Sequence, residues 1–260
     1  MSRQVSLRQY SSRVTALRVA LSGIIMATAA IAGPVHADYP DRSIQLVLSF
    51  PPAGATDILA RAIGQKMSEA LGQNVIIENK PGGGGIIGLT SAAKALPDGY
   101  TLYLAAVTNA AIAAAAYTPK PIHLIKDFIP VAGIATVPHM LVVPASLPVQ
   151  NMGQLITLFK ASPGKYNFAS QGSGTLSHLE SEVFMTTVGL ELVHVPYKGS
   201  SQALPDLMSG ISSMMFDSIP ASMPHVKSGK LRVLAVASSK RVSLLPNVPT
   251  VDESGVKGFE

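Results

Sequence analysis

The chain has 260 residues, 20 Lys and Arg against 15 Asp and Glu, and no cysteine. The absence of thiols excludes disulfides, a cysteine-based zinc site and a thiol nucleophile. Four arginines fall within residues 1–18, and without them 16 basic residues balance 15 acidic ones, which gives no electrostatic case for nucleic acid as a partner.

Residues 1–37 predict a secretory signal peptide. Arginines without any acid precede an apolar run at 19–33, and Val35-His36-Ala37 forms a small-x-small cleavage site. The run is too short for a good membrane span. A mitochondrial-type presequence is the alternative, but such presequences lack a clean apolar core. We therefore expect an exported protein made of residues 38–260.

The next segments predict strand, helix, strand, helix and strand in turn, which favours a parallel sheet with right-handed crossovers. Apolar residues of the first helix recur at i, i+4 spacing, and Gly72 suits its C-terminal end. The expected ranges are strands 43–50, 74–79 and 101–106, with helices 57–72 and 86–96.

Irregular chain is expected up to residue 130, and a second α/β lobe follows. Short apolar runs predict its strands, and amphipathic runs predict its helices. Ser177 and Glu180 have the spacing of a capping box. The expected strands are 131–136, 139–144, 166–170, 190–197, 212–218 and 230–238, with helices 151–162, 176–189 and 202–210.

Gly83, Gly85 and Gly88 satisfy the G-x-G-x-x-G pattern of dinucleotide-binding folds. Here, however, the pattern begins several residues after the strand, and the position about twenty residues beyond it carries no acid, where that motif requires one. We therefore expect no cofactor, and we attribute these glycines to a tight turn into the helix.

Three strand-to-helix loops carry the functional signal: "PPAGATD" (51–57), "QGSGT" (171–175) and "KGSS" (198–201). In open α/β sheets, ligands bind outside the carboxyl ends of the strands. Free amides and the helix dipole at these positions attract anions. The loops predict a small anion, such as a carboxylate, held by amides and hydroxyls. The alternative interpretation is that Gly and Ser merely turn the chain.

Catalytic motifs are lacking: there is no G-x-S-x-G elbow, P-loop or H-E-x-x-H pattern. Ser173, His178 and Asp217 could form a triad only by coincidence of residue type, because the spacing does not support a nucleophile–base pair. We therefore predict that the protein is not an enzyme and that it uses no metal.

The ordered motifs "FPPAGATDILARAIGQKMSEALGQNVIIENKPGGGG", "PDGYTLYL", "SPGKYNFASQGSGTLSHL" and "VHVPYKGSSQALPDLMSG" resemble the Bug-type periplasmic solute-binding receptors of tripartite tricarboxylate transporters. The resemblance runs from about residue 39 to the last residue. It implies a two-lobed, periplasmic-binding-protein-like α/β fold, each lobe a mainly parallel sheet flanked by helices. It places residues 38–135 and 239–260 in lobe 1 and residues 136–238 in lobe 2.

The resemblance also implies a small carboxylate or related polar metabolite as ligand, the membrane components of the transporter as partner, and a monomer. Family members grip the ligand between two loops, and further segments face the same cleft. The substrate-binding residues implied by motif are Pro52, Ala53, Gly54, Ala55, Thr56 and Asp57 in the first loop, Ser170, Gly172, Ser173, Gly174, Thr175 and His178 in the second, and Thr108, Tyr197 and Asp217.

Two features depart from the family pattern. Ala53 stands where the family usually has Gly, so a positive φ there would strain the loop. Members normally continue beyond the segment that ends here at Glu260, which implies a chain truncated within lobe 1. Asp57 or Asp217 could select an ammonium-bearing ligand, although Asp57 is better explained as a helix cap.

The sequence leaves three alternatives to a receptor for uptake. The first is a sensor that presents its ligand to a signalling partner. The second is a secreted hydrolase that uses Ser173 and His178, and the third is a non-functional truncated remnant.

Overall fold

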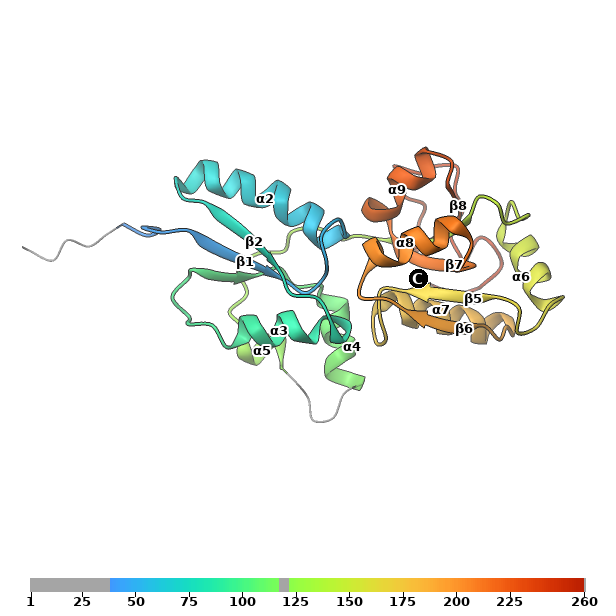
Figure 1. The fold of residues 1–260 in the computed structure, drawn as a ribbon, viewed down its shortest axis with the longest axis horizontal. Helices are drawn as coiled ribbons and strands as arrows, with labels where there is room; N and C mark the ends of the chain where they lie inside the picture. Colours follow the sequence, from blue (N-terminus) through green and yellow to red (C-terminus); the bar gives the residue numbers. More distant parts are fainter. Residues whose placement is uncertain (1–37, 117–121, 260) are drawn as a thin grey trace, which may run out of the picture. The chain divides into compact units, whose positions relative to one another are not determined.

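The computed structural model describes residues 38–116 and 122–259. The expected signal peptide lies outside the described residues, so it stays a prediction. The described chain forms two sheets, one with the order β2-β1-β3 and one with the order β6-β5-β7-β4-β8 (Figure 1). We call residues 42–116 the N-terminal region and residues 139–259 the C-terminal region.

The sheet of the N-terminal region is entirely parallel. Strand β1 lies in the middle and pairs in parallel with β2 and β3, as the expected strand and helix order requires. Helix α2 packs on β1 and β2, and helix α3 packs on β1 and β3. The bounds are β1 (Ile44–Leu48), α2 (Ala55–Leu71), β2 (Val75–Asn79), a 3-10 turn (Gly83–Gly85), α3 (Ile86–Ala93), β3 (Thr101–Tyr103) and α4 (Val107–Ala116).

Close packing explains the glycine-rich segment. A Cβ atom on Gly88 would lie 2.8 Å from Ser49 Cα and 2.9 Å from Leu48 O. Gly85 has φ 105°, in the region that L-residues rarely adopt. These glycines therefore let α3 begin with a tight turn, as the sequence predicted, and they also let it lie directly against β1, which the sequence did not predict.

The sheet of the C-terminal region is mixed. Strands β6, β5 and β7 are parallel, whereas β4 is antiparallel to both β7 and β8. The bounds are β4 (His139–Pro144), α6 (Met152–Lys160), β5 (Asn167–Ser170), α7 (Leu176–Val188), β6 (Val193–Pro196), α8 (Ser200–Ser209), β7 (Met214–Ser218), α9 (Ile219–Lys227) and β8 (Leu231–Ala237); a short α5 (Leu124–Asp127) precedes this region.

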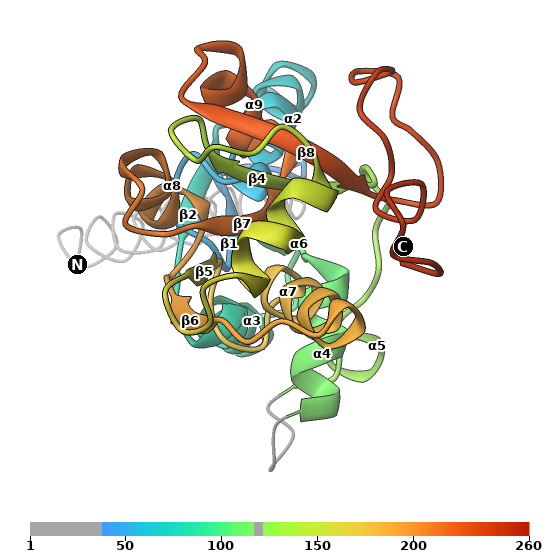
Figure 2. The same ribbon diagram turned by 90° about the vertical axis from the view of Figure 1, so that its right-hand side faces the viewer.

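Alternate residues of the central strands feed two cores, one on each face of this sheet. Leu141 and Phe216 belong to a cluster of 18 buried residues that includes α6 and α7, while Met140 and Met215 belong to a cluster of 12 that includes α8 and α9. Figure 2 shows α8 and α6 on opposite sides of the sheet. The sheet is therefore covered on both faces.

The segment 250–259 lies in the first of these cores. Val251, Val256 and Phe259 are buried there, and Phe259 stacks on Phe216 with ring centroids 5.4 Å apart. Thr250 also forms a parallel bridge with Val236 of β8. These residues thus add apolar side chains to the core beside β7 and β8, and the expected assignment of 239–260 to lobe 1 stays a prediction.

Among the described residues, helices α4, α9 and the short α5 were missed, and one expected strand was wrong. Helix α4 is Ala-rich without a clear amphipathic period, and α9 contains Pro220 and Pro224. Pro220 is accommodated because it stands in the first turn, where an amide hydrogen is not needed. The segment 131–136 is not a strand, and no ladder pairs with it among the described residues.

Candidate functional site

A cavity of about 1710 Å³ lies at the carboxyl ends of the parallel strands. Five strand-to-helix junctions line it, and each presents the N-terminus of a helix. The junctions are β1–α2 (Gly54, Ala55 and Thr56), β3–α4 (Val107, Thr108 and Asn109), β5–α7 (Gln171 and Leu176), β6–α8 (Ser200) and β7–α9 (Ser218). This is the position at which open α/β sheets bind ligands.

Helix N-termini are the features of this cavity that favour an anion. The unpaired amides of a helix's first turn carry a partial positive charge that favours anions. No Lys or Arg occurs among the cavity's lining residues in the part of the chain that the structure describes. An anion here would be held by amide and hydroxyl groups rather than by a side-chain cation.

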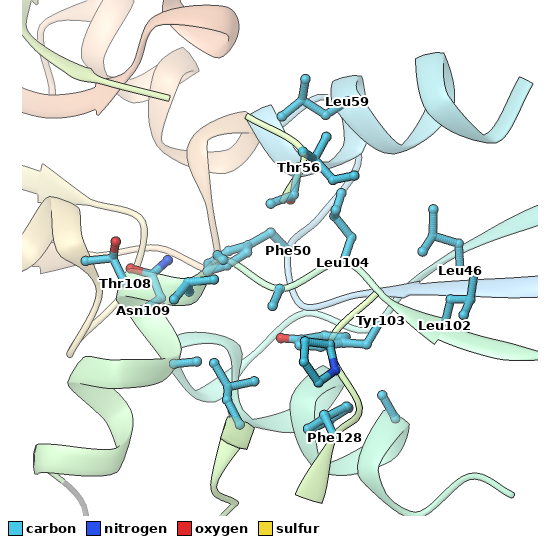
Figure 3. A pocket seen from close by; sticks show the side chains of 18 of the residues that line it. Leu46, Phe50, Thr56, Leu59, Leu102, Tyr103, Leu104, Thr108, Asn109 and Phe128 are labelled. Carbon is cyan, nitrogen blue, oxygen red and sulfur yellow. The ribbon is translucent and has the colours of Figure 1, made fainter. Parts of the chain in front are cut away.

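The cavity has a polar end and an apolar end. Figure 3 shows Thr108 and Asn109 at one end and Leu46 and Leu102 at the other, with Phe50 between them. The apolar end is the face of β1 and β3 beside α2, together with the segment 123–137. The total volume exceeds that of ordinary small-molecule sites, because it includes this uncovered sheet face.

Two buried hydroxyl oxygens, both on residues that line the cavity, have no hydrogen-bond partner within the described chain. They are Thr56 Oγ1 in the first turn of α2 and Ser218 Oγ at the N-terminus of α9. Buried polar atoms are normally paired, so orphans of this kind mark positions where a ligand or a water supplies the partner.

A carboxylate within the protein holds the first loop in place. Asp57 Oδ2 accepts from the Ala53 amide at 3.0 Å, and both carboxylate oxygens accept from Arg61 at 2.9 Å. Asn79 also donates to Asp57 Oδ1 at 3.1 Å and to the carbonyl of Phe50 at 2.9 Å. The side chain of Asp57 is therefore fully occupied by the loop and helix that carry it.

The pKa of Asp57 reflects this arrangement. Burial raises the pKa, but the hydrogen bonds from Arg61, Ala53 and Asn79 outweigh burial and hold it below the usual value. Gly54, not Asp57, is the N-cap residue of α2. Asp57 therefore acts in the first turn, where a negative charge is favourable next to the helix dipole.

Ala53 has φ 64°, the one positive φ of a non-glycine residue in the described ranges. The conformation costs an alanine roughly 1–2 kcal/mol. The hydrogen bond from its amide to Asp57 fixes this strained geometry. The alanine thus holds the first loop in a strained conformation.

The second loop is held by close backbone contacts. Gly172 has φ 132°, and a Cβ there would lie 2.9 Å from the carbonyl oxygen of Tyr197; one on Gly84 would lie 2.7 Å from that of Ser173. The amide of Leu176 donates to Asn109 Oδ1 at 2.8 Å, so a residue of α4 caps α7. Glycine is required where these loops meet.

His178 and His194 stack beneath the second loop with ring centroids 4.1 Å apart. His178 Nδ1 accepts from the Gly174 amide at 3.3 Å, and its Nε2 lies 3.4 Å from Glu182 Oε1. Burial, and then the neighbouring His178, lowers the pKa of His194 to about 4. Both nitrogens of His178 thus have partners other than Ser173, so the geometry does not form the nucleophile–base pair of a hydrolase.

Asp217 lies completely buried at the end of β7. Gln171 Nε2 and Ser200 Oγ donate to its Oδ1 at 2.8 and 2.6 Å, and Ser222 Oγ donates to Oδ2. One carboxylate therefore joins the second loop, the start of α8 and the first turns of α9. Burying a charge is tolerated when donors satisfy it in this way.

His139 and Glu180 form a buried pair near Asp217, with His139 Nδ1 2.6 Å from Glu180 Oε2. Burial lowers the pKa of His139, but the carboxylates of Glu180 and Asp217 outweigh burial and raise it. Glu180 is thus engaged by β4 instead of a capping box, and Ser177 Oγ donates to the carbonyl of Phe216.

The structure brings only some of the predicted site residues to the cavity. Gly54, Ala55, Thr56 and Thr108 line it, and sequence reasoning missed Gln171 and Ser218 as lining side chains. The residues that lie in the loops or behind them without lining the cavity are Pro52, Ala53, Asp57, Ser170, Gly172, Ser173, Gly174, Thr175, His178, Tyr197 and Asp217. Ligand contacts of all these residues stay predictions.

Whether Tyr197 faces the cleft or the core was hard to predict from the sequence. Its hydroxyl donates to Asp206 Oδ2 at 2.6 Å, and its ring packs on the core beneath α8 and α9. Burial, and then Asp206, raises the pKa of Tyr197. A tyrosine at a strand end can face either the cleft or the core, and here the packing of α8 turns it to the core.

No group of His, Asp and Glu suited to hold a metal ion occurs in residues 38–116 and 122–259. Among the same residues, the helices are too short or too polar to cross a membrane.

The model of the tripartite tricarboxylate transporter family receptor matches residues 59–260. The chain belongs to this family. It is 39% identical to protein BugT of Bordetella pertussis over 93% of this chain and 74% of BugT. It resembles the periplasmic binding protein BugD at TM-score 0.82 and 36% identity, over 85% of this chain and 74% of that one. An R. palustris protein solved with adipate matches at TM-score 0.81 and 38% identity, over 86% of this chain and 75% of that one.

The family and the fold are those of solute-binding receptors rather than of enzymes. The expected α/β architecture and the Bug-type resemblance are thereby confirmed. The division into lobes and the expected truncation stay predictions.

Proposed function

We propose that this protein is a periplasmic receptor that binds a small carboxylate in the cavity at the strand ends and delivers it to a tripartite tricarboxylate transporter. The observation that carries the proposal is the convergence of five helix N-termini on one cavity whose lining, as far as the described residues show, includes no Lys or Arg. Such a site favours an anion small enough to be bound by amides and hydroxyls. The adipate bound by a family relative is an anion of this class.

The protein is then exported by the segment 1–37, acts as a monomer, and does not transform its ligand. The absence of a Ser173–His178 hydrogen bond within the described residues supports binding without turnover. Thr56 is a residue with which we expect the ligand carboxylate to interact, because its buried hydroxyl has no partner within residues 38–116 and 122–259 and stands in the first turn of α2.

Ligand-induced stabilisation of the purified protein tests the proposal. Since the chain has no Trp, unfolding is followed by circular dichroism or a reporter dye, against a panel of mono- and dicarboxylates. A ligand at about 100 times its Kd should stabilise the protein by about 2.7 kcal/mol. Failure of every carboxylate to raise the melting temperature would refute the proposal.

Thr56→Val gives the matched variant, since it removes one hydroxyl at nearly constant volume. We expect it to weaken binding of all responding carboxylates. Thr187→Val is the control, because Thr187 lies on the exposed side of α7 and bonds only to Val183 O of its own helix. Delivery is tested separately: deletion of the gene should abolish uptake of the ligand, whereas a changed transcriptional response with normal uptake would indicate a sensor.

A further inference from the structure

Ser218 holds an unusual position in the cavity. It is the last residue of β7 and the N-cap of α9, its side chain is 2% exposed, and its Oγ has no partner within the described chain. An N-cap serine normally accepts a hydrogen bond from the second or third residue of its helix. Here no such bond forms, and the second residue is Pro220, which has no amide hydrogen.

The neighbouring polar groups are already occupied. Ser200, Ser222 and Gln171 all donate to Asp217, and the Ile219 amide donates to the carbonyl of Pro138. Ser218 is thus the hydroxyl that this cluster leaves available to the cavity it lines. A buried hydroxyl in a cavity with no protein partner is a position for a ligand atom.

The charges around Ser218 favour an uncharged ligand group. Asp217 precedes it, and the nearby His139 is paired with Glu180. A second ligand carboxylate would thus meet a buried carboxylate, and no Lys or Arg of the described chain lines the cavity there. A ligand ammonium would face the N-terminus of α9, where the helix dipole disfavours positive charge. A ligand hydroxyl avoids both costs, since it can donate to or accept from Ser218 Oγ.

We propose that Ser218 determines specificity for a hydroxyl group, so that the ligand is a hydroxycarboxylate. This inference rests on the proposed function, in which the carboxylate binds at the other helix N-termini, among them that of α2 with Thr56. The hydroxyls of Thr56 and Ser218 would then form hydrogen bonds with two different groups of one ligand.

Pairs of acids that differ by one hydroxyl test the proposal, for example succinate with malate and propionate with lactate. Isothermal titration of the purified protein measures the Kd of each. A site built to bond a hydroxyl discriminates strongly against the analogue that lacks it, so we expect the hydroxylated member of at least one pair to bind about tenfold tighter or more.

Ser218→Ala should reduce this ratio to about one while the acid without the hydroxyl binds as it does to the unmodified protein. Ser218→Gly serves the same purpose if the alanine variant does not fold, and Ser209→Ala is the control, because Ser209 is exposed at the far end of α8.

The outcomes separate the two proposals. Equal binding of both members in every pair, or a ratio unchanged in the Ser218 variants, overturns the specificity assignment and leaves the carboxylate receptor standing. Absence of binding by any carboxylate overturns both.

Discussion

The two regions of the molecule differ in how completely they bury their sheets. The C-terminal region has 18 buried residues on one face of its sheet and 12 on the other. The cluster of the N-terminal region contains three buried residues, Leu46, Leu48 and Ala60, among those described. The face of β1 and β3 beside α2 instead borders the cavity. Burial drives folding, so we infer that the C-terminal region supplies most of the stability.

The two regions also differ in how they hold the loops beside the cavity. The C-terminal region fixes the loops that lie beside the cavity through Asp217 and the His178–His194 stack. The N-terminal region contributes a loop held by Asp57 and a strained Ala53. We expect the N-terminal region to open locally at a lower free-energy cost than the C-terminal region, since regions with few buried contacts have low local stability.

The largest effect should follow from Phe216→Ala. Phe216 is fully buried and stacks on Phe259. It also meets Phe184 edge-on, with ring centroids 5.8 Å apart. The cavity left by the ring should reduce the free energy of unfolding by about 3–5 kcal/mol, measured by urea denaturation followed by circular dichroism. A loss below about 1 kcal/mol would contradict the central role of this core.

Leu48→Ala makes the corresponding change in the N-terminal region. Leu48 is fully buried in the small cluster, and we expect a loss of about 2 kcal/mol, at the low end for such substitutions, because a cluster next to a cavity can relax. The same denaturation measurement applies. A loss as large as that for Phe216→Ala would remove the distinction between the regions.

Asp217→Asn tests the polar anchor of the C-terminal region. The change replaces an acceptor of three hydrogen bonds by a group that also donates, so at least one bond from Ser200, Ser222 or Gln171 should be lost. We expect destabilisation of about 1–3 kcal/mol. Asp98→Asn is the control, since the exposed Arg42–Asp98 pair should contribute at most about 1 kcal/mol. Equal losses of stability for the two changes would show that the hydrogen bonds to Asp217 do not stabilise the C-terminal region.

His194 predicts a pH dependence. Its pKa is lowered from 6.5 to about 4 in the folded protein, so the unfolded chain binds a proton first as the pH falls. The contribution to stability is therefore intact above pH 6.5 and is lost progressively between pH 6.5 and about 4. In His194→Gln the decline in melting temperature over this range should be smaller than in the unmodified protein.

His139 is present in both of these proteins, so its opposite pH dependence cancels in the difference. Identical pH profiles for the unmodified protein and His194→Gln would show that His194 does not titrate as inferred.

The smallest effect is expected for Ala53→Gly. Glycine relieves the strain at φ 64° but loses more entropy on folding, so the gain should be below about 1 kcal/mol. Ala55→Gly, in the first turn of α2, should instead destabilise the protein by up to about 1 kcal/mol. A fall in melting temperature for Ala53→Gly would argue against strain in the first loop.

The sequence by itself determined most elements and the place of the site. Hydrophobic periodicity and turn residues predicted β1, α2, β2, α3, α6, α7 and α8, and loop chemistry predicted an anion site at the strand ends. These signals are local, because a strand, a helix turn and a glycine loop each depend on a few neighbouring residues. Helices α4 and α9 escaped because alanine and proline obscure the helical period.

Tertiary structure decided which side chains serve the cavity and which serve the framework. Asp57 and Asp217 look like ligand contacts in the sequence, and in the structure both accept hydrogen bonds from protein groups up to 46 residues away. Ser218 looks ordinary in the sequence, yet its hydroxyl has no partner in the described part of the chain, because the neighbouring donors bond to Asp217. Phe259 packs in the core beside β7, where it stacks on Phe216. Such competition for partners depends on long-range packing, which no local pattern in the chain encodes.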